Sequence, residues 1–348
     1  MINLLDLDFN ELSQLLVRFT DQKFRAKQVF DALYKGKEFA EMTDISNDLK
    51  NKLAAECIAQ PVKVYKKFIS TDGTVKYLLE LQDKNIIEAV LMQYKYGKTL
   101  CVSSQVGCPM GCAFCASGIN GLVRNLTAGE ILGEVISINR DAGQNFERVI
   151  TNIVMMGSGE PLYNYENTVK FLKLVNSADG LNISQRNISV STCGLPDKIK
   201  QLADDGFSIT LTISLHSANN EIRKKIMPVA REYNLKQLMD SATYYFNKTG
   251  RRVILEYVLI KGVNDSIVDI RSLAQTCKHL VCHVNVIRLN TVKEKALEGV
   301  TKAEAYKFVE GLTALGVSAT LRRTMGADIE GACGQLRRRV IADDDSII

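Results

Sequence analysis

Three cysteines lie within one short, glycine-containing segment, Gly107-Cys108-Pro109-Met110-Gly111-Cys112-Ala113-Phe114-Cys115. Three residues separate the first cysteine from the second, and two separate the second from the third. Thiolates at these positions could wrap around a single metal centre. A [4Fe–4S] cube usually takes four thiolate ligands, so three thiolates would leave one of its irons open to another ligand. The segment is therefore a candidate metal centre with an open coordination position.

The spacing and the aromatic residue before Cys115 resemble the C-x3-C-x2-C motif of radical S-adenosylmethionine enzymes. In those enzymes the open iron binds the amine and carboxylate of S-adenosylmethionine, and an electron from the cluster breaks the sulfonium C–S bond to yield a 5′-deoxyadenosyl radical. The alternative is a zinc site that a distant Cys or His completes. The most common zinc pattern contains two C-x2-C pairs, whereas the chain has only one such pair. The sequence favours an iron–sulfur cluster held by Cys108, Cys112 and Cys115.

Polar residues that could bind a cofactor follow several predicted strands. In Met156-Gly157-Ser158-Gly159-Glu160-Pro161 the glycines would let the backbone approach a ligand, and the Glu160 carboxylate could meet the ammonium group of S-adenosylmethionine. Such a turn is common, but its place one β–α unit after the cysteines favours a binding role. Other residues of this kind are Ser191, Ser214, His216 and Asn290. A single histidine is more often structural, and the strand-end position of His216 leaves both interpretations open.

The first 85 residues predict a small helical accessory domain with a β extension. Apolar residues recur there at helical spacing, and a paired set of strands should follow, with a turn at Thr71-Asp72-Gly73. The expected helices lie at residues 12–16, 26–33 and 46–53, and the expected strands at 62–68 and 75–81.

Residues 86–340 predict the catalytic domain, because strand-like runs alternate there with helical segments. The expected strands lie at residues 100–103, 152–156, 187–191, 209–214, 253–259, 283–289 and 317–321. The expected helices lie at residues 128–139, 169–175, 235–246, 267–276 and 303–312. Repeated β–α units predict an α/β fold, a partial (β/α) barrel with helices outside a parallel sheet and a site at the C-terminal ends of the strands. Residues 341–348 are expected to be a C-terminal tail.

Composition excludes several classes of protein. The chain has 348 residues, 46% hydrophobic and 24% charged, which is ordinary for a globular protein. No apolar run approaches the roughly 20 residues that span a bilayer, and the acidic N-terminus does not resemble a secretory signal, so we expect a cytoplasmic protein. The net charge of +5 is mild. Four basic clusters could meet phosphates or could form a solvated face: 223–225, 251–252, 322–323 and 337–339.

Several stretches together resemble the RlmN family of adenine-C2 methyltransferases, which act on 23S ribosomal RNA and on transfer RNA. The resemblance covers about residues 24–340 and rests on segments that stand in the family's order. They are Phe24-Arg25-Ala26-Lys27-Gln28-Val29-Phe30, Cys101-Val102-Ser103-Ser104-Gln105-Val106-Gly107-Cys108, Gly121-Leu122-Val123-Arg124-Asn125-Leu126, Gly159-Glu160-Pro161-Leu162-Tyr163-Asn164, Ser214-Leu215-His216, Gly262-Val263-Asn264-Asp265 and Ala332-Cys333-Gly334-Gln335-Leu336.

The resemblance implies roles for residues that the pattern alone would not select. It makes Cys333 the methyl carrier, Cys101 the resolving cysteine and Glu88 the proton acceptor. By pattern alone, Glu88 would be a solvent-facing strand residue, and free cysteines are usually buried as small hydrophobes. The implied contacts of S-adenosylmethionine are Gly159, Glu160, Ser191, Ser214, Leu215, His216 and Asn290. The remaining cysteines are expected to be buried as small hydrophobes: Cys57, Cys193, Cys277 and Cys282.

The chemistry of adenine explains why such an enzyme would need these groups. The C2 carbon is electron-poor and cannot attack the electrophilic methyl group of S-adenosylmethionine, whereas the Cys333 thiolate can. A second S-adenosylmethionine would supply the radical that removes hydrogen from the S-methyl group, and the carbon radical would add to the ring. Release would require Glu88 to take the ring proton and Cys101 to attack the carrier sulfur, leaving a disulfide that a cellular thiol reduces. The target base would have to leave its stack to reach the site.

The implied partners are 23S rRNA and tRNA, an electron donor and a thiol reductant, with no membrane and no obligate protein partner. One alternative is a Cfr-type methyltransferase that acts at adenine C8, although Gly-Glu-Pro-Leu resembles the C2 enzymes more closely. Another is a non-catalytic iron–sulfur redox sensor that binds RNA. The chain departs from the family at Ser158, where methionine is common, and at Arg288, where many members have proline.

Overall fold

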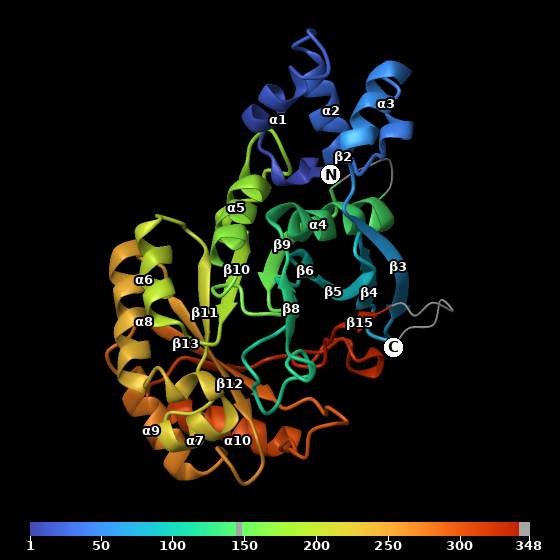
Figure 1. Cartoon of the computed structure of the whole chain (residues 1–348). Coiled ribbons are helices and arrows are strands. Elements are labelled where there is room, and N and C mark those ends of the chain that lie inside the picture. The colour runs from blue at the N-terminus through green and yellow to red at the C-terminus, as the bar shows by residue number, and fades with distance from the viewer. Residues whose placement is uncertain (144–147, 341–348) are drawn as a thin grey trace.

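The computed structural model describes residues 1–143 and 148–340, and Figure 1 shows its N-terminal helices at one end of a large sheet. The predicted tail at residues 341–348 lies outside the described residues. Within the described ranges, no helix combines the length and the apolar composition needed to cross a bilayer.

The three predicted N-terminal helices are confirmed. α1 (Phe9–Leu16) begins after Asp8, whose carboxylate accepts a hydrogen bond from the Glu11 amide at 2.8 Å. α3 (Asn47–Glu56) begins after Ser46, whose hydroxyl accepts from an amide of the first turn. The other elements of this region are α2 (Arg25–Tyr34), β1 (Ile2–Asn3), β2 (Cys57–Ile58) and the 3₁₀ helices Leu4–Asp6 and Phe39–Glu41.

An antiparallel run of strands joins these helices to the rest of the chain. β3 (Val62–Ile69) and β4 (Val75–Leu81) form the predicted hairpin, and Gly73 in its turn has a φ of 83°, which favours glycine. β5 (Asn85–Tyr94) and β6 (Gly97–Cys101) continue the antiparallel order, and the short β15 (Arg339–Val340) pairs with β5.

The predicted parallel strands are present and lie side by side. They are β9 (Ile150–Met155), β10 (Ile188–Thr192), β11 (Thr210–Ser214), β12 (Val253–Leu259), β13 (Cys282–Arg288) and β14 (Ala319–Leu321). They follow β6 in sequence order, and every pair from β6 to β14 is parallel. Among the described strands, β3 and β14 end the order without pairing with each other, so the sheet is a partial barrel as predicted.

Helices cover the outside of the sheet, as Figure 1 shows for α6 and α8 beside each other and for α9 and α10. They are α4 (Ala128–Ala142), α5 (Tyr165–Asn176), α6 (Pro196–Asp204), α7 (Asn220–Ile226), α8 (Leu235–Thr249), α9 (Ile267–Cys277) and α10 (Lys302–Ala314), with 3₁₀ helices at Gln185–Asn187, Pro228–Arg231 and Ala327–Ile329. The sequence did not predict α6 and α7, and α7 has only seven residues and buries only two side chains.

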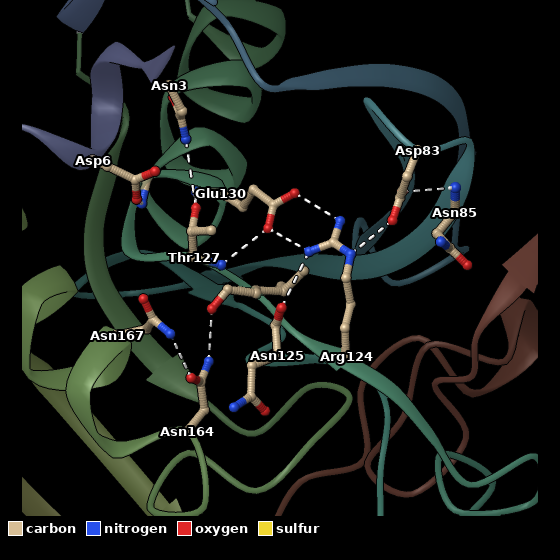
Figure 2. Close-up of polar contacts among 12 residues, drawn as sticks. Asn3, Asp6, Asp83, Asn85, Arg124, Asn125, Thr127, Glu130, Asn164 and Asn167 are labelled. Atoms are coloured by element: carbon tan, nitrogen blue, oxygen red, sulfur yellow. Dashed lines mark hydrogen bonds and ion pairs between the residues drawn. The ribbon is translucent and has the colours of Figure 1, made fainter. Parts of the chain in front are cut away.

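A polar network ties the first residues of the chain to the start of α4. Figure 2 shows Arg124 between two carboxylates: its guanidinium donates to both oxygens of Glu130, at 2.7 and 2.8 Å, and to Asp83 at 2.7 Å. The Asn3 amide donates to Thr127, and the Asp6 carboxylate accepts from a backbone amide of α4 at 2.6 Å. These bonds hold the strand that follows the cysteine segment.

One large hydrophobic cluster extends through most of the described chain, and two smaller clusters are separate from it. The buried members of the large cluster extend from Leu4 in the N-terminal region to Val317 before β14. Residue 85 lies at the start of β5, inside the sheet. The division into an accessory domain and a catalytic domain at this residue stays a prediction.

Candidate active site

One cavity lies at the C-terminal ends of the parallel strands, and it collects most of the predicted site residues. The three cysteines of the motif line it together with Cys333. The other predicted residues that line it are Gly159, Glu160, Ser191, Ser214, His216 and Asn290. Among the predicted cofactor contacts, Leu215 is the exception, because its side chain is fully buried in the hydrophobic core.

The cysteine segment is a loop between two short paired strands, β7 (Gln105–Gly107) and β8 (Leu122–Asn125). Gly107 has a φ of 80°, and a Cβ there would lie 2.1 Å from the Gly121 carbonyl oxygen, so this position requires glycine. The Ala113 amide donates to the Ile226 carbonyl at 2.9 Å, which ties the middle of the loop to the end of α7. The loop is therefore fixed at its base and at its middle.

The three thiols lie on one loop, and each could bind a separate iron of a cube. Among the described residues, no three His, Cys, Asp or Glu side chains converge closely enough to hold one metal ion. A zinc ion needs its sulfurs about 2.3 Å away in one tetrahedron, whereas a cube binds each thiolate at a separate iron. Burial raises the pKa of Cys108 to about 12 and raises that of Cys112 as well, so ligation must displace their protons. The donor set fits a three-cysteine iron–sulfur cluster.

Glu160 is buried and held in one orientation by backbone amides. Its two carboxylate oxygens accept from the Cys193 amide at 2.6 Å and the Leu162 amide at 3.0 Å. Burial raises its pKa despite these bonds. The sequence interpretation of Cys193 as a buried hydrophobe was incomplete, because this cysteine lines the cavity and its thiol donates to Glu160. A carboxylate fixed in this way can receive an ammonium group.

The glycines before Glu160 serve packing. A Cβ on Gly157 would lie 2.6 Å from the Val102 carbonyl oxygen, and one on Gly159 would lie 2.6 Å from the Ser104 hydroxyl. The end of β9 therefore packs directly against the segment that follows β6, which explains why small residues stand there.

His216 is a neutral, structurally constrained residue of the cavity wall. Its φ is 55°, and its Nδ1 accepts a hydrogen bond from the Val258 amide at 3.1 Å. Burial, and secondly the charge of Arg223, lowers its pKa to about 3. Asn264 donates to the carbonyls of His216 and Val258, both at 2.7 Å, which supports this unusual backbone conformation.

The interpretation of the basic cluster at 223–225 as a phosphate-binding site is wrong for its first residue, Arg223. The Arg223 side chain is fully buried (0% exposed) and donates to the carbonyls of Leu215 and Cys193 at 3.1 and 2.7 Å. It therefore ties together the loops after β10 and β11 and cannot reach RNA.

The segment that carries Cys333 is held against both the cysteine loop and the residues after β13. Asn290 donates to the Cys333 carbonyl at 3.0 Å, and the Ala116 amide donates to the Gly334 carbonyl at 2.7 Å. Gln335 donates to the Thr291 carbonyl at 2.9 Å. These contacts bring a residue near the C-terminus beside the cysteine loop.

A second cavity adjoins the first and contains both cysteines that the resemblance selected. Cys101 lines it, and Cys333 lines both cavities. Burial, and secondly the neighbouring Cys333, raises the pKa of Cys101. Met156, Asn290 and Arg322 also line both cavities, so the two spaces share a wall.

Sequence reasoning missed the place of Arg322 in this shared wall and its partner Glu256, which lines the first cavity only. Arg322, interpreted as part of a phosphate-binding pair, points inward and contacts the Glu256 carboxylate and the Met156 sulfur, each at 3.4 Å. The nearby Cys333 sulfur and Glu256 raise the pKa of Arg322. A carboxylate within the apolar strand β12 was the available signal, because a charge in such a run needs a partner.

The pattern-based interpretation of Glu88 as solvent-facing is wrong. Its side chain is 0% exposed, it lies 3.6 Å from the Lys76 ammonium, and it accepts from the Arg337 amide at 2.9 Å. The C-terminal segment covers this face of β5, and Glu88 lines neither of the two cavities.

Comparison with known proteins agrees with this geometry. The radical SAM superfamily model matches residues 102–274, and the model of the ribosomal RNA large subunit methyltransferase N-terminal domain matches residues 2–59. A crystal structure of a radical SAM methyltransferase from Sphaerobacter thermophilus is 40% identical, with a TM-score of 0.93 over 97% of this chain and 99% of that chain.

Curated relatives match over nearly the full length. The protein described as a probable dual-specificity RNA methyltransferase RlmN in Clostridium novyi is 48% identical over 99% of this chain and 100% of its own length. Its counterpart in Clostridium perfringens is 49% identical over 98% of both chains. The chain therefore belongs to the RlmN family of radical SAM RNA methyltransferases.

Proposed function

We propose that the protein methylates C2 of adenine in 23S ribosomal RNA and transfer RNA, with Cys333 as the methyl carrier. The observation that carries this proposal is the position of Cys333, which lines the cavity of the three cluster cysteines and also the cavity that contains Cys101. A methyl group on the Cys333 sulfur could lose hydrogen in the cavity of the three cluster cysteines and be transferred to adenine in the cavity that contains Cys101.

The residues of the first cavity would hold the cofactors. Cys108, Cys112 and Cys115 would bind the [4Fe–4S] cluster, and the fixed Glu160 carboxylate would receive the ammonium of S-adenosylmethionine. When bound together, these groups supply the 5′-deoxyadenosyl radical that removes hydrogen from the methyl group on Cys333. Ser191, Ser214, the Leu215 backbone, His216 and Asn290 would complete the binding wall.

The Cys333 sulfur would first attack the methyl group of one S-adenosylmethionine, with S-adenosylhomocysteine as the leaving group. A second S-adenosylmethionine would be consumed in forming the methylene radical, which adds to the electron-poor C2 carbon. Arg322 lies beside Cys333 and would stabilise negative charge on its sulfur.

Release of the product would require a second sulfur and a base. The Cys101 thiol would lose its proton and attack the Cys333 sulfur, forming an S–S bond as the S–CH₂ bond breaks. The electron pair of the broken bond would stay on the CH₂ carbon of the adenine, and this carbon would take up a proton to become the methyl group. Before that attack, Glu88 would accept the C2 proton, and the unpaired electron left on the ring would return to the cluster that supplied it, so that the tethered adenine is closed-shell. Because Glu88 is buried behind the Cys333 segment, that segment would have to shift in this step. An external thiol would then reduce the disulfide.

The test is anaerobic turnover of the reconstituted protein on unmodified RNA, followed by mass spectrometry of the nucleosides. We expect 2-methyladenosine from the wild-type chain and none from Cys333→Ala. Cys101→Ala should accumulate RNA joined covalently to the protein, because nothing releases the tether. Methylation by Cys333→Ala, or 8-methyladenosine as the product, would contradict the proposal. A bound cluster without 5′-deoxyadenosine formation would instead support a redox sensor.

A further inference from the structure

Two tyrosines form a stack at the hairpin between β5 and β6. Tyr94 ends β5, Tyr96 stands in the turn, and their ring centroids are 5.1 Å apart with planes inclined by only 5°. Tyr94 is half-buried and lines the second cavity together with Cys101 and Cys333. Tyr96 is 67% exposed, so the outer side of the stack is open to solvent. The stack therefore leads from the wall of the proposed reaction site to the surface.

The hairpin holds this stack in place before any ligand arrives. Tyr94 pairs with Gly97, whose φ is 138°, and a Cβ on Gly97 would lie 2.2 Å from the Thr151 hydroxyl of β9. The Tyr94 hydroxyl also contacts the Met92 sulfur at 3.6 Å. The turn is thus packed directly against the neighbouring strand, and a ligand that stacks on Tyr96 would not need to order it first.

The exposed side chains around the stack favour a polyanionic ligand. Lys95 lies beside Tyr96 in the turn, and Arg323 is exposed and lines the second cavity. Neither forms a salt bridge with another residue in the ranges 1–143 and 148–340. An exposed aromatic ring combined with cationic side chains is an arrangement with which proteins bind single-stranded nucleic acid.

We propose that the open face of Tyr96 is a stacking platform for the unpaired base next to the target adenine. The inference rests on the proposed function, because an adenine that enters the cavity beside Cys333 must leave its stack and exposes a face of its neighbour. Tyr96 replaces the lost stacking partner, while Lys95 and Arg323 meet the adjoining phosphates. The platform does not depend on the identity of the base, since every base has a flat face.

The test uses short RNA hairpins that carry fluorescent 2-aminopurine on the 5′ or the 3′ side of the target adenine. Binding to the wild-type chain should quench one of these probes, and Tyr96→Ala should abolish the quenching and weaken RNA binding by about 5- to 140-fold. Tyr96→Phe should restore both. Tyr306→Ala is the matched control, because Tyr306 on α10 is 48% exposed and lines neither cavity.

Formation of 5′-deoxyadenosine without RNA should be unchanged in Tyr96→Ala, which would show an intact cluster and fold. Wild-type affinity and quenching in Tyr96→Ala would overturn the inference, as would an equal loss in Tyr306→Ala. If the wild-type chain methylates RNA and Tyr96→Ala still binds RNA normally, the inference about Tyr96 is wrong and the proposed function stands. If the wild-type chain neither binds nor methylates RNA, the proposed function fails with it.

Discussion

The two cysteines of the second cavity differ in their surroundings. Cys101 is buried, and burial raises its pKa, so the protonated thiol is its resting form. Cys333 is partly exposed and has the cationic Arg322 beside it, with Glu256 as the counter-ion of that arginine. This difference matches the proposed order of events, in which Cys333 reacts first and Cys101 only after the product is tethered.

Arg322→Met should slow the alkylation of Cys333 by iodoacetamide at a fixed pH. The arginine is the cation beside the sulfur, and a partly screened charge pair contributes about 1 kcal/mol, or roughly fivefold in rate. Peptide mass spectrometry of the anaerobic holoprotein measures this rate. Arg323→Met, which removes an exposed neighbour, should leave it unchanged, and equal rates in both variants would refute the role of Arg322.

His216 should make folding less favourable in acid. Its folded pKa of about 3 lies below the ordinary value of 6.5, so between these values the unfolded chain binds a proton that the folded chain does not. Stability contributed by the neutral ring is therefore present above pH 6.5 and is lost as the pH falls toward 3. In His216→Asn, the decrease in unfolding free energy from pH 7.5 to pH 5 should be smaller by up to about 2 kcal/mol. Urea denaturation at both pH values measures it, and an unchanged decrease would contradict the assignment.

At the scale of elements, the decisive piece is the loop that carries Cys333. It has no regular secondary structure, and it is positioned by hydrogen bonds to the cysteine loop and to the residues after β13. Two loops far apart in the sequence thus support each other at the point where, in the proposed mechanism, the methyl group would meet the radical.

Gln335→Ala should separate positioning from cofactor chemistry. Gln335 donates to the Thr291 carbonyl and accepts from the Ala332 amide, so its loss loosens the Cys333 loop. A misplacement of about 1 Å can reduce a rate on the order of 100-fold. We expect RNA methylation to fall by about 10- to 100-fold, while RNA-independent formation of 5′-deoxyadenosine stays at the wild-type level. A parallel loss of both activities would show that the residue supports the cluster instead.

At the scale of the whole molecule, the parts of the chain share one core. The N-terminal helices pack on the same hydrophobic cluster as the parallel sheet, and Asn3 and Asp6 bond to the first turn of α4. The antiparallel strands β3 to β5 extend the same sheet and carry Glu88.

We expect the full chain to unfold in one cooperative thermal transition, because the N-terminal helices and the parallel sheet belong to the same hydrophobic cluster. Circular dichroism and tyrosine fluorescence should report the same midpoint. A chain that begins at residue 60 should melt at a lower temperature, since it exposes the apolar face of α4 that the N-terminal segment covers. Two resolved transitions in the full chain would contradict this expectation.

The sequence by itself determined the local features of the protein. The β–α alternation predicted the parallel strands because apolar periodicity depends only on neighbouring residues. The three-cysteine spacing likewise indicated a candidate metal centre, and the strand ends indicated Glu160, Ser191, Ser214 and Asn290, which line one cavity.

Only the tertiary structure decided which side chains are buried and which distant segments meet. The local pattern alone predicted that Glu88 faces solvent, but Lys76 and the amide of Arg337 cover it. Arg223 and Arg322 seemed to form surface clusters, yet one ties loops together inside the protein and the other lies in the cavity wall. The physical reason is that burial and charge pairing depend on packing between residues up to about 250 positions apart, which no local pattern records.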